Sequence, residues 1–346
     1  MYSQIIRPLL FALSPERAHN ISFKALELIC RIPGAAAIIR RRHSLNHPAL
    51  QRELFGVTFR NPVGISAGVD CDGKYYNQLG LFGAGFVEIG TLTNAPQEGN
   101  AKPRWYRLKG RRAFVNNLGH ANKGVRSAIS NIQKNPPKDI VVIASIAKNS
   151  ETPSEKAVED IDRCYTLIYD FSDIVVINML DTDIGRINEI IDRVTSIRRF
   201  NDEHHPILVK IPPDMSHEEM DAAVHAVLSY GIDGLVVSGS TYSTDAIEFN
   251  MEHGELSGAP VFEHSLETLK YVLGKSKGLI PVIISGGIMT PEQALTMLDN
   301  GASLIELHTG LAFEGPMLIK RILKHLVATD RERHPEKYTK HGKLKK

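Results

Sequence analysis

The feature that most constrains the fold of this chain is a series of eight short apolar runs, rich in β-branched residues, between residues 61 and 310. The runs are Asn61–Gly68, Gly85–Thr91, Ile140–Ala147, Asp173–Met179, Ile207–Ile211, Gly234–Ser240, Pro281–Gly287 and Leu304–Gly310. They are continuously apolar, which is typical of parallel strands that are buried on both faces. Segments with a helical pattern separate most of them, for example Ser216–Ser229 and Pro291–Asn300. Eight successive β/α units predict a (β/α)8 TIM barrel, and a doubly wound open sheet is the competing architecture.

In such a barrel the functional residues lie at the carboxyl ends of the strands. Those ends read Ser66-Ala67-Gly68, Gly90-Thr91, Ser145, Asn178, Lys210, Ser238-Gly239-Ser240, Ser285-Gly286-Gly287 and His308-Thr309-Gly310. The glycines after the last two strands, each followed by a helix, predict a cradle of backbone N–H groups for a phosphorylated ligand such as a flavin nucleotide. We interpret Lys210 as a fixed cation beside a reduced flavin. The alternative is a lysine whose ammonium group extends to solvent at the barrel mouth.

The N-terminal segment has apolar residues at helical spacing on both sides of a break at Ser14-Pro15. A serine followed by proline is a typical helix start, so the segment predicts two short amphipathic helices joined by a turn. These helices either pad the main domain or form a peripheral membrane hairpin, with Arg40-Arg41-Arg42 near lipid head groups. We therefore divide the chain into an N-terminal helical hairpin (1–43), a barrel (44–336) and a basic tail (337–346).

The net charge of +2 is distributed unevenly along the chain. Residues 1–43 contain seven basic and two acidic side chains, and residues 337–346 contain five lysines and no acid, which leaves −8 for the body. Two basic ends indicate contact with an anionic surface, either a membrane or nucleic acid. The basic ends lack interleaved aromatic residues and carry no nucleic-acid-binding motif, which disfavours nucleic acid. A solvated, disordered terminus is the alternative for the tail.

The three cysteines are too few and too scattered for a disulfide framework or a zinc site, and we expect no metal. This usage favours a reduced, cytoplasmic setting. No apolar run approaches the roughly 20 residues that a membrane-spanning helix needs. The N-terminal apolar stretch is interrupted by Pro8 and ends in Pro15-Glu16-Arg17, unlike a secretory signal.

A set of motifs distributed over essentially the whole chain points to one family. The motifs are Arg7-Pro8-Leu9-Leu10-Phe11, Pro15-Glu16-Arg17-Ala18-His19, Asn61-Pro62-Val63-Gly64, Gly85-Phe86-Val87-Glu88-Ile89-Gly90-Thr91, Lys102-Pro103-Arg104, Lys148-Asn149, Lys210-Ile211, Leu256-Ser257-Gly258 and Thr309-Gly310-Leu311. Together they resemble the quinone-dependent (class 2) dihydroorotate dehydrogenases. In that family FMN takes a hydride from dihydroorotate, a base removes the neighbouring proton, and a quinone reoxidises the flavin. The resemblance implies an FMN-binding barrel and an N-terminal quinone tunnel that lies peripherally on the cytoplasmic side of the membrane.

The resemblance also implies which residues bind FMN. The matching positions are Ala67, Gly68, Thr91, Asn178, Lys210, Gly258, Gly286, Gly287, Thr309 and Gly310. Three further positions depart from the family: Ser145 replaces an asparagine, Ser238 a threonine and His308 a tyrosine. Glu255 replaces a glycine near the phosphate end of the implied site.

The residues that the resemblance assigns to the substrate depart further. Cys71 replaces the lysine that helps to hold the orotate carboxylate. Asp181 falls at the position of the serine base, and Asp183 at that of a substrate-binding asparagine. Gly239, next to Ser240, replaces another asparagine, whereas Asn116 and Asn122 are kept and His120 replaces a phenylalanine.

Losing a lysine and gaining two acids opposes binding of an anionic substrate, since each lost charge-assisted hydrogen bond costs about 1.5–3 kcal/mol. We therefore expect an FMN oxidoreductase with a changed, neutral or cationic substrate. In it Asp181 acts as base, and His120 or His308 acts as acid or base. Cys71 is either a nucleophile or a packed thiol. The first alternative is dihydroorotate oxidation with a rebuilt catalytic loop. The second is a catalytically silent FMN-binding scaffold, against which Lys210 and Asn178 argue.

Overall fold

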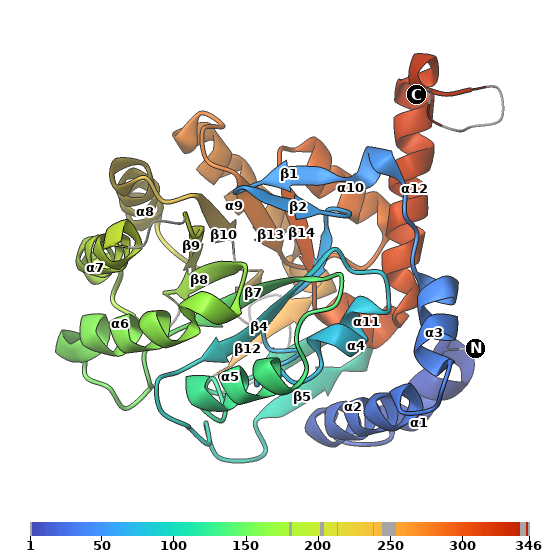
Figure 1. The fold of residues 1–346 in the computed structure, drawn as a ribbon, viewed down its shortest axis with the longest axis horizontal. Helices are drawn as coiled ribbons and strands as arrows, with labels where there is room; N and C mark the ends of the chain where they lie inside the picture. Colours follow the sequence, from blue (N-terminus) through green and yellow to red (C-terminus); the bar gives the residue numbers. More distant parts are fainter. Residues whose placement is uncertain are drawn as a thin grey trace.

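Eight parallel strands close into a barrel at the centre of the molecule (Figure 1). In barrel order they are β3 (Val63–Ile65), β4 (Phe86–Leu92), β7 (Val141–Ile146), β8 (Ile174–Asn178), β9 (Ile207–Ile211), β10 (Gly234–Val237), β13 (Val282–Ser285) and β14 (Leu304–Leu307). The computed structural model describes residues 2–179, 182–200, 204–212, 214–237, 239–243, 254–339 and 344. Each predicted apolar run supplies one barrel strand, so the predicted (β/α)8 barrel is confirmed over the competing open sheet.

Helices surround the barrel and explain why its strands are apolar on both faces. They are α4 (Tyr76–Gly80), α5 (Val125–Lys134), α6 (Ala157–Ile168), α7 (Ile187–Phe200), α8 (His217–Tyr230), α9 (Phe262–Ser276), α10 (Pro291–Asp299), α11 (Thr309–Glu314) and α12 (Met317–Arg333). Both helices named from the sequence begin within one residue of their predicted start. Ser216 and Glu219 form a capping box at the start of α8, and the Thr290 hydroxyl accepts a hydrogen bond from the Gln293 amide at the start of α10.

The barrel interior is filled by one side chain from each of several strands and is closed at its amino-terminal end. Phe86, Ile143, Leu208 and Ile283 are fully buried there. A short antiparallel hairpin, β1 (Arg52–Leu54) and β2 (Val57–Phe59), brings Phe59 edge-on against the Phe86 ring, with 5.5 Å between centroids. This packing closes the amino-terminal end, so the open end lies where the strand carboxyl termini meet.

A second sheet of four antiparallel strands has no counterpart in the pattern of apolar runs. Its order is β11 (Ser240–Thr241), β12 (Glu255–Gly258), β6 (Ala113–Asn116) and β5 (Trp105–Leu108). The sheet joins loops that follow β4 and β10, two barrel strands that are distant in the sequence. It therefore places Asn116 and Ser240 beside the open end of the barrel.

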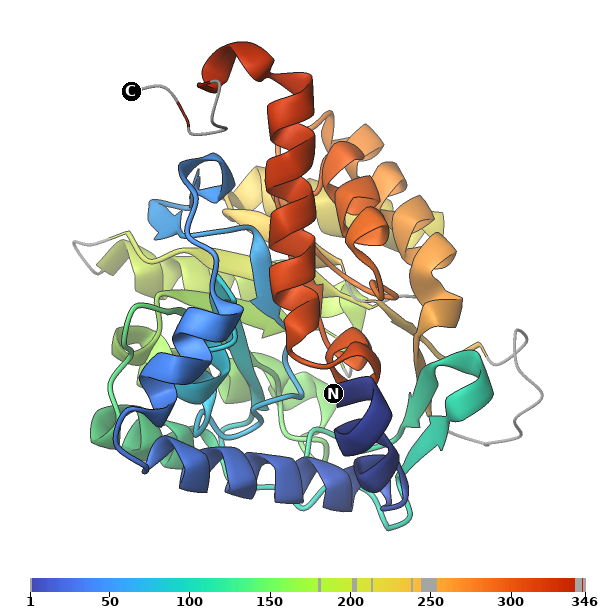
Figure 2. The same cartoon turned by 90° about the vertical axis from the view of Figure 1, so that its right-hand side faces the viewer.

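The N-terminal segment lies outside the barrel as four short helical elements (Figure 2). They are a π-helical turn η1 (Tyr2–Ile6), α1 (Arg7–Phe11), α2 (Pro15–Cys30) and α3 (Ala35–His43). The predicted break at Ser14-Pro15 is confirmed, and α3, which carries Arg40–Arg42, is an addition to the two expected helices. The segment is anchored through Tyr2, whose hydroxyl donates to the Ala312 carbonyl (2.6 Å), and through Glu16, paired with Arg104 (2.9 Å).

The N-terminal segment exposes many large apolar side chains among its polar and basic ones. Ile5, Leu9, Ile21, Leu28, Ile29, Ile32 and Ile38 are all classed among the exposed large hydrophobic residues. Leu9, Leu28 and Ile38 have 68%, 65% and 69% of their surface exposed. Within the described ranges, no helix combines the length and apolar character needed to cross a membrane.

The start of the basic tail packs on the barrel domain. Tyr338 is buried, its ring stacks on His47 with 6.0 Å between centroids, and its hydroxyl donates to Asp330. The boundary predicted at residue 337 therefore falls within a packed segment. Four of the five tail lysines, Lys340, Lys343, Lys345 and Lys346, lie outside the described residues.

Candidate active site

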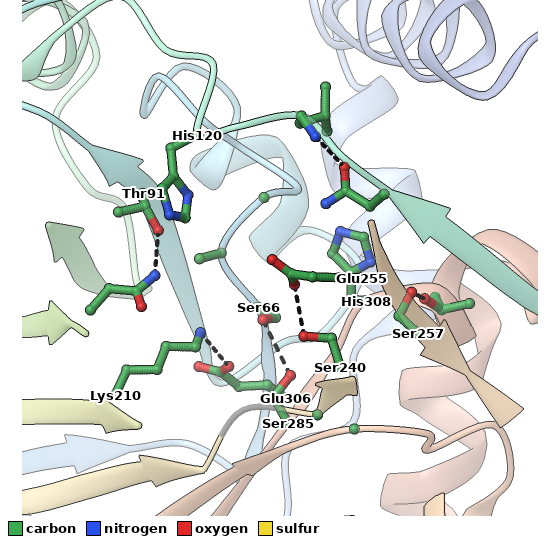
Figure 3. A pocket seen from close by; sticks show the side chains of 18 of the residues that line it. Ser66, Thr91, His120, Lys210, Ser240, Glu255, Ser257, Ser285, Glu306 and His308 are labelled. Atoms are coloured by element: carbon green, nitrogen blue, oxygen red, sulfur yellow. Dashed lines mark hydrogen bonds and ion pairs between the residues drawn. The ribbon is translucent and has the colours of Figure 1, made fainter. Parts of the chain in front are cut away.

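A cavity of about 750 Å³ opens at the carboxyl ends of the barrel strands (Figure 3). Most residues assigned from the sequence line it: Ala67, Gly68, Cys71, Thr91, Asn116, His120, Asn178, Lys210, Gly239, Ser240, Gly258, Gly286, Gly287, His308, Thr309 and Gly310. Strand ends and the small antiparallel sheet thus bring these side chains together from positions up to 243 residues apart. Asp181 and Ser238 lie outside the described residues.

The floor of the cavity holds a buried ion pair. Lys210 donates to both carboxylate oxygens of Glu88, at 3.1 and 3.0 Å, and lies 3.9 Å from Glu306 (Figure 3 shows Lys210 and Glu306). Burial alone would raise the pKa of Glu88, but Lys210, supported by Glu306 and the Ala67 amide, outweighs burial and lowers that pKa below its usual value. The same partners raise the pKa of Lys210 against its burial. Lys210 is therefore a fixed cation, and its ammonium group does not extend to solvent.

The polar wall above this floor is built from Thr91 and Asn178. The Asn178 amide donates to the Thr91 hydroxyl at 3.0 Å, and the hydroxyls of Thr91 and Ser145 lie 3.2 Å apart. Ser145 is fully buried and lies behind Thr91, outside the cavity lining. We expected Ser145 to contact a cofactor directly, but its side chain does not line the cavity. Its hydroxyl group contacts the Thr91 hydroxyl, which does.

The turns after β13 and β14 form the end of the cavity that was predicted to cradle a phosphate. Gly287 has φ of 67°, and an added Cβ would lie 2.5 Å from the Phe262 backbone, so this turn requires glycine. The Thr309 and Ser257 hydroxyls lie 2.9 Å apart beside it. The expected helix follows β14 directly as α11, whereas after β13 the helix begins only at Pro291.

On the substrate side, Cys71 is a protonated thiol. Burial raises its pKa to about 12, and the neighbouring acids Asp72 and Asp70 add to the effect. Its sulfur lies 3.5 Å from the Gly68 carbonyl. A thiol with such a pKa is a poor nucleophile at neutral pH, which favours the packed-thiol interpretation.

Two residues assigned to the substrate serve the backbone instead. Asn122 is buried and binds the Thr93 hydroxyl, the His120 carbonyl and the Gly124 amide, outside the cavity lining. Asp183 is exposed and accepts a hydrogen bond from the Gly185 amide at 2.9 Å, so it caps a short helical turn. Asparagine and aspartate are common in such local roles, which explains both corrections.

His308 stands between the cavity and the N-terminal helices. Burial lowers its pKa to about 4, and burial does the same for His19 on α2. Both imidazoles are therefore neutral at pH 7, and the expectation that His308 exchanges a proton near neutral pH is wrong. The Trp105 ring lies between them, with its centroid 5.8 Å from His19 and 6.4 Å from His308.

The structure adds three functional candidates, Glu88, Glu306 and Lys148, to which the sequence analysis gave no role, and it gives Glu255 a hydrogen-bond partner. Glu88 and Glu306 are buried acids within otherwise apolar strand runs. An acid that interrupts an apolar run was the sequence signal by which both residues could have been found. Lys148 is 8% exposed and lines the cavity. Glu255, at the cavity wall, accepts a hydrogen bond from the Ser240 hydroxyl at 2.8 Å.

A barrel with one such cavity above a buried Glu–Lys pair belongs to the class of (β/α)8-barrel enzymes. The dihydroorotate dehydrogenase family pattern matches residues 49–329. The dihydroorotate dehydrogenase (quinone) of Christiangramia forsetii is 37% identical over 333 residues, covering 93% of this chain and 97% of that protein. The Acinetobacter baumannii enzyme of the same name is 33% identical over 341 residues, covering 94% and 99%. A dihydroorotate dehydrogenase from Eimeria tenella, solved with ferulenol, superposes with a TM-score of 0.80 at 25% identity, covering 93% of both chains.

This chain therefore belongs to the quinone-dependent (class 2) dihydroorotate dehydrogenase family. The family consists of flavin-dependent oxidoreductases that act on CH–CH groups. The cavity is large enough for a nucleotide cofactor, because its volume of about 750 Å³ lies within the usual range of about 300–1,000 Å³ for ligand sites. It also holds a buried carboxyl group, that of Glu306, whose two oxygens make no hydrogen bond of good geometry within the described residues.

Proposed function

We propose that this chain is an FMN-dependent, quinone-linked dehydrogenase whose substrate carries less negative charge than dihydroorotate. The observation that carries the proposal is the substrate wall: a neutral Cys71 thiol stands where the family has a lysine. The carboxylate of Glu255 lines the same cavity, near the end that the family pattern assigns to the phosphate, and adds negative charge to the cavity as a whole. A wall with this charge favours a neutral or cationic cyclic amide over an anion.

When bound, FMN would supply the redox chemistry: it would accept a hydride from the substrate and pass the electrons to a quinone. In this proposal Thr91, Asn178 and Lys210 hold the ring, and the glycine turns at Gly286-Gly287 and Thr309-Gly310 hold the phosphate. Asp181 takes the substrate proton, as its place in the family pattern suggests. His120, which lines the cavity near Thr91 in Figure 3, is the second proton-exchanging candidate.

The quinone site in this proposal lies between α2 and the barrel. The row of rings from His19 through Trp105 to His308 connects that region with the cavity wall. Because both imidazoles are neutral at pH 7, this passage presents polar atoms without adding charge, which suits an apolar quinone. The exposed apolar side chains of α1–α3, with Arg40–Arg42, would contact an anionic membrane surface peripherally.

The membrane contact predicts a specific loss of vesicle binding. Leu9→Glu with Leu28→Glu should weaken sedimentation with phosphatidylglycerol-containing vesicles at least tenfold, since burying one leucine is worth about 1.5–3 kcal/mol. Leu279→Glu is the matched control, because this leucine is 72% exposed and lies outside the N-terminal helices. Equal binding by the double variant and the control would contradict the proposed surface.

Dihydroorotate itself is the second candidate substrate, favoured by the relatives and by one observation in the cavity. Lys148 has a buried ammonium group whose single hydrogen bond among the described residues is a long one, 3.3 Å, to the Asn149 carbonyl. This cation could replace the lysine lost at Cys71 as the partner of a substrate carboxylate.

Lys148→Met distinguishes the two candidates. If dihydroorotate binds through Lys148, the variant should need about 10- to 150-fold more dihydroorotate for half-maximal flavin reduction, the equivalent of one charged hydrogen bond. Lys156→Met, an exposed lysine on the same loop, is the control. An unchanged half-saturation in Lys148→Met would remove the observation that favours dihydroorotate.

The deciding experiment is anaerobic mixing of the yellow protein with dihydroorotate and with a panel of neutral dihydropyrimidines and related cyclic amides. Loss of the flavin absorbance with a neutral compound, and not with dihydroorotate, supports the proposal, whereas the reverse establishes the second candidate. Restoration of the absorbance by quinone after dithionite reduction tests the quinone link. A flavin that quinone cannot reoxidise would instead indicate a silent scaffold.

A further inference from the structure

We propose that Glu306 is held as a neutral carboxylic acid in the cavity floor, and that its O–H group is a hydrogen-bond donor to the ring of the bound cofactor. Glu306 would thus be a positioning residue that adjusts the electron affinity of the site. The second half of this proposal rests on the proposed FMN site, whereas the first half concerns the protein alone.

The geometry singles out Glu306 among the acids of the site. It lies on β14, is 1% exposed and lines the cavity. Its carboxyl group interacts with the Glu88 carboxyl group and the Ser66 hydroxyl, but neither of its oxygens makes a hydrogen bond of good geometry within the described part of the chain. Glu88 is equally buried, but both of its oxygens are bound by Lys210. A buried polar group costs free energy unless its hydrogen bonds are complete, so we infer that a ligand in the cavity completes those of the Glu306 carboxyl group.

The balance of charge explains why the proton stays on Glu306. One ammonium group faces two buried carboxyl groups, and it lies 3.0 Å from Glu88 but 3.9 Å from Glu306. Ionising both acids would leave an uncompensated negative charge away from water. Burial and the negative charge of Glu88 accordingly raise the pKa of Glu306 well above its usual value, and Lys210 only partly opposes them.

The other charged and titratable groups around the floor do not reverse this balance. Glu255, from β12, adds a further negative charge that acts on Lys210. His308, which follows Glu306 by two residues, is neutral at pH 7 because burial lowers its pKa to about 4. Ser66, at the end of β3, contributes a hydroxyl group and no charge. Lys210 is thus the cation of this floor among the described residues, and Glu88 holds it.

A neutral acid and a carboxylate would act on a flavin in opposite ways. An O–H donor stabilises a ring that has gained electrons, whereas a carboxylate at the same place repels it. With Glu306 protonated, Glu88, Lys210 and Glu306 together have no net charge. The floor then presents the Lys210 cation and a donor, and both favour the reduced cofactor.

Infrared spectroscopy of the FMN-free protein tests the protonation state directly. At pH 8, where Asp70 with its pKa of about 6 is ionised, we expect a carboxylic-acid carbonyl band that shifts in D2O and disappears in Glu306→Gln. Glu53→Gln is the control and should keep the band, because Glu53 is exposed and hydrogen bonds lower its pKa. A wild-type spectrum without the band, or a band that persists in Glu306→Gln, would overturn the proposal.

The midpoint potential of the loaded protein tests the donor. Glu306→Gln should keep the wild-type potential between pH 6 and 8, because the amide is neutral and also donates, whereas Glu306→Leu should lower it. A higher potential in Glu306→Gln would mean that a carboxylate had been removed, and a wild-type potential in both variants would exclude the donor role. If Glu306→Leu does not fold, wild type and Glu306→Gln still decide the charge. A protein that never retains FMN would refute the proposed function while leaving the infrared result intact.

Discussion

Lys210→Met is expected to destabilise the protein by about 3–5 kcal/mol and to abolish reduction of FMN by any substrate. The variant leaves Glu88, which is 0% exposed, without the ammonium group that now binds both of its oxygens. Breaking a buried pair by removing one partner has this cost because the remaining charge is uncompensated. Urea unfolding of the FMN-free protein measures the stability, and anaerobic flavin bleaching measures the activity.

The stability loss should depend on pH in a defined direction. In the wild type the pKa of Glu88 is lowered, so its stabilisation is present above the unfolded value of about 4.3 and is lost as pH falls through the folded value. Without Lys210, burial raises that pKa instead, so the folded variant binds more protons than the unfolded chain and gains stability as pH falls. The difference between wild type and Lys210→Met should therefore be smaller at pH 5 than at pH 8.

Two further variants control this prediction. Lys210→Met combined with Glu88→Gln removes both charges and should recover much of the lost stability, but not the flavin reduction. Lys324→Met removes an exposed lysine on α12, and it should change neither measurement. A difference that grows as pH falls, or a double variant as unstable as the single one, would show that the Lys210–Glu88 pair does not determine the stability.

The barrel could be predicted from the sequence because its determinants are local. Each strand is a continuous apolar run, and each of the helices at His217 and Pro291 starts at a capping residue that is legible in the sequence. Barrel topology then places every strand end at one opening, so the lining residues at the strand ends, such as Thr91, Asn178 and Lys210, followed from the position of each run alone.

The remaining features depend on contacts between distant residues or on competition for a hydrogen bond. Lys210 and Glu88 are 122 residues apart, and their pairing across the barrel is set by the register of the strands. The four-stranded sheet joins short segments that have no distinctive pattern of their own. Asp183 and Asn122 match the family pattern by position, yet each satisfies nearby backbone amides instead. The position of a residue in a motif therefore predicts where its backbone lies, whereas hydrogen bonds to nearby backbone amides determine the orientation of its side chain.

Cys71→Lys is expected to raise the efficiency of dihydroorotate oxidation by about 10- to 150-fold, measured as the dependence of anaerobic flavin bleaching on dihydroorotate concentration. The gain corresponds to one charge-assisted hydrogen bond of about 1.5–3 kcal/mol between the new ammonium group and the substrate carboxylate. The thiol borders the cavity, and Asp70 and Asp72 lie close enough to raise its pKa. The same two carboxylates would favour the charged form of a lysine at this position.

Cys71→Met is the matched control, because it adds length without charge and should not improve dihydroorotate oxidation. For a neutral substrate identified from the panel, Cys71→Lys should lower the efficiency of flavin bleaching, because the lysine would place an unpaired cation against that substrate. A gain with Cys71→Met equal to that with Cys71→Lys would show that cavity shape, and not charge, limits dihydroorotate. Full dihydroorotate activity in the wild type together with no gain in Cys71→Lys would mean that another cation, Lys148 by its position, already holds the carboxylate. The pair of variants thus decides whether the charge at position 71 sets the substrate class of this barrel.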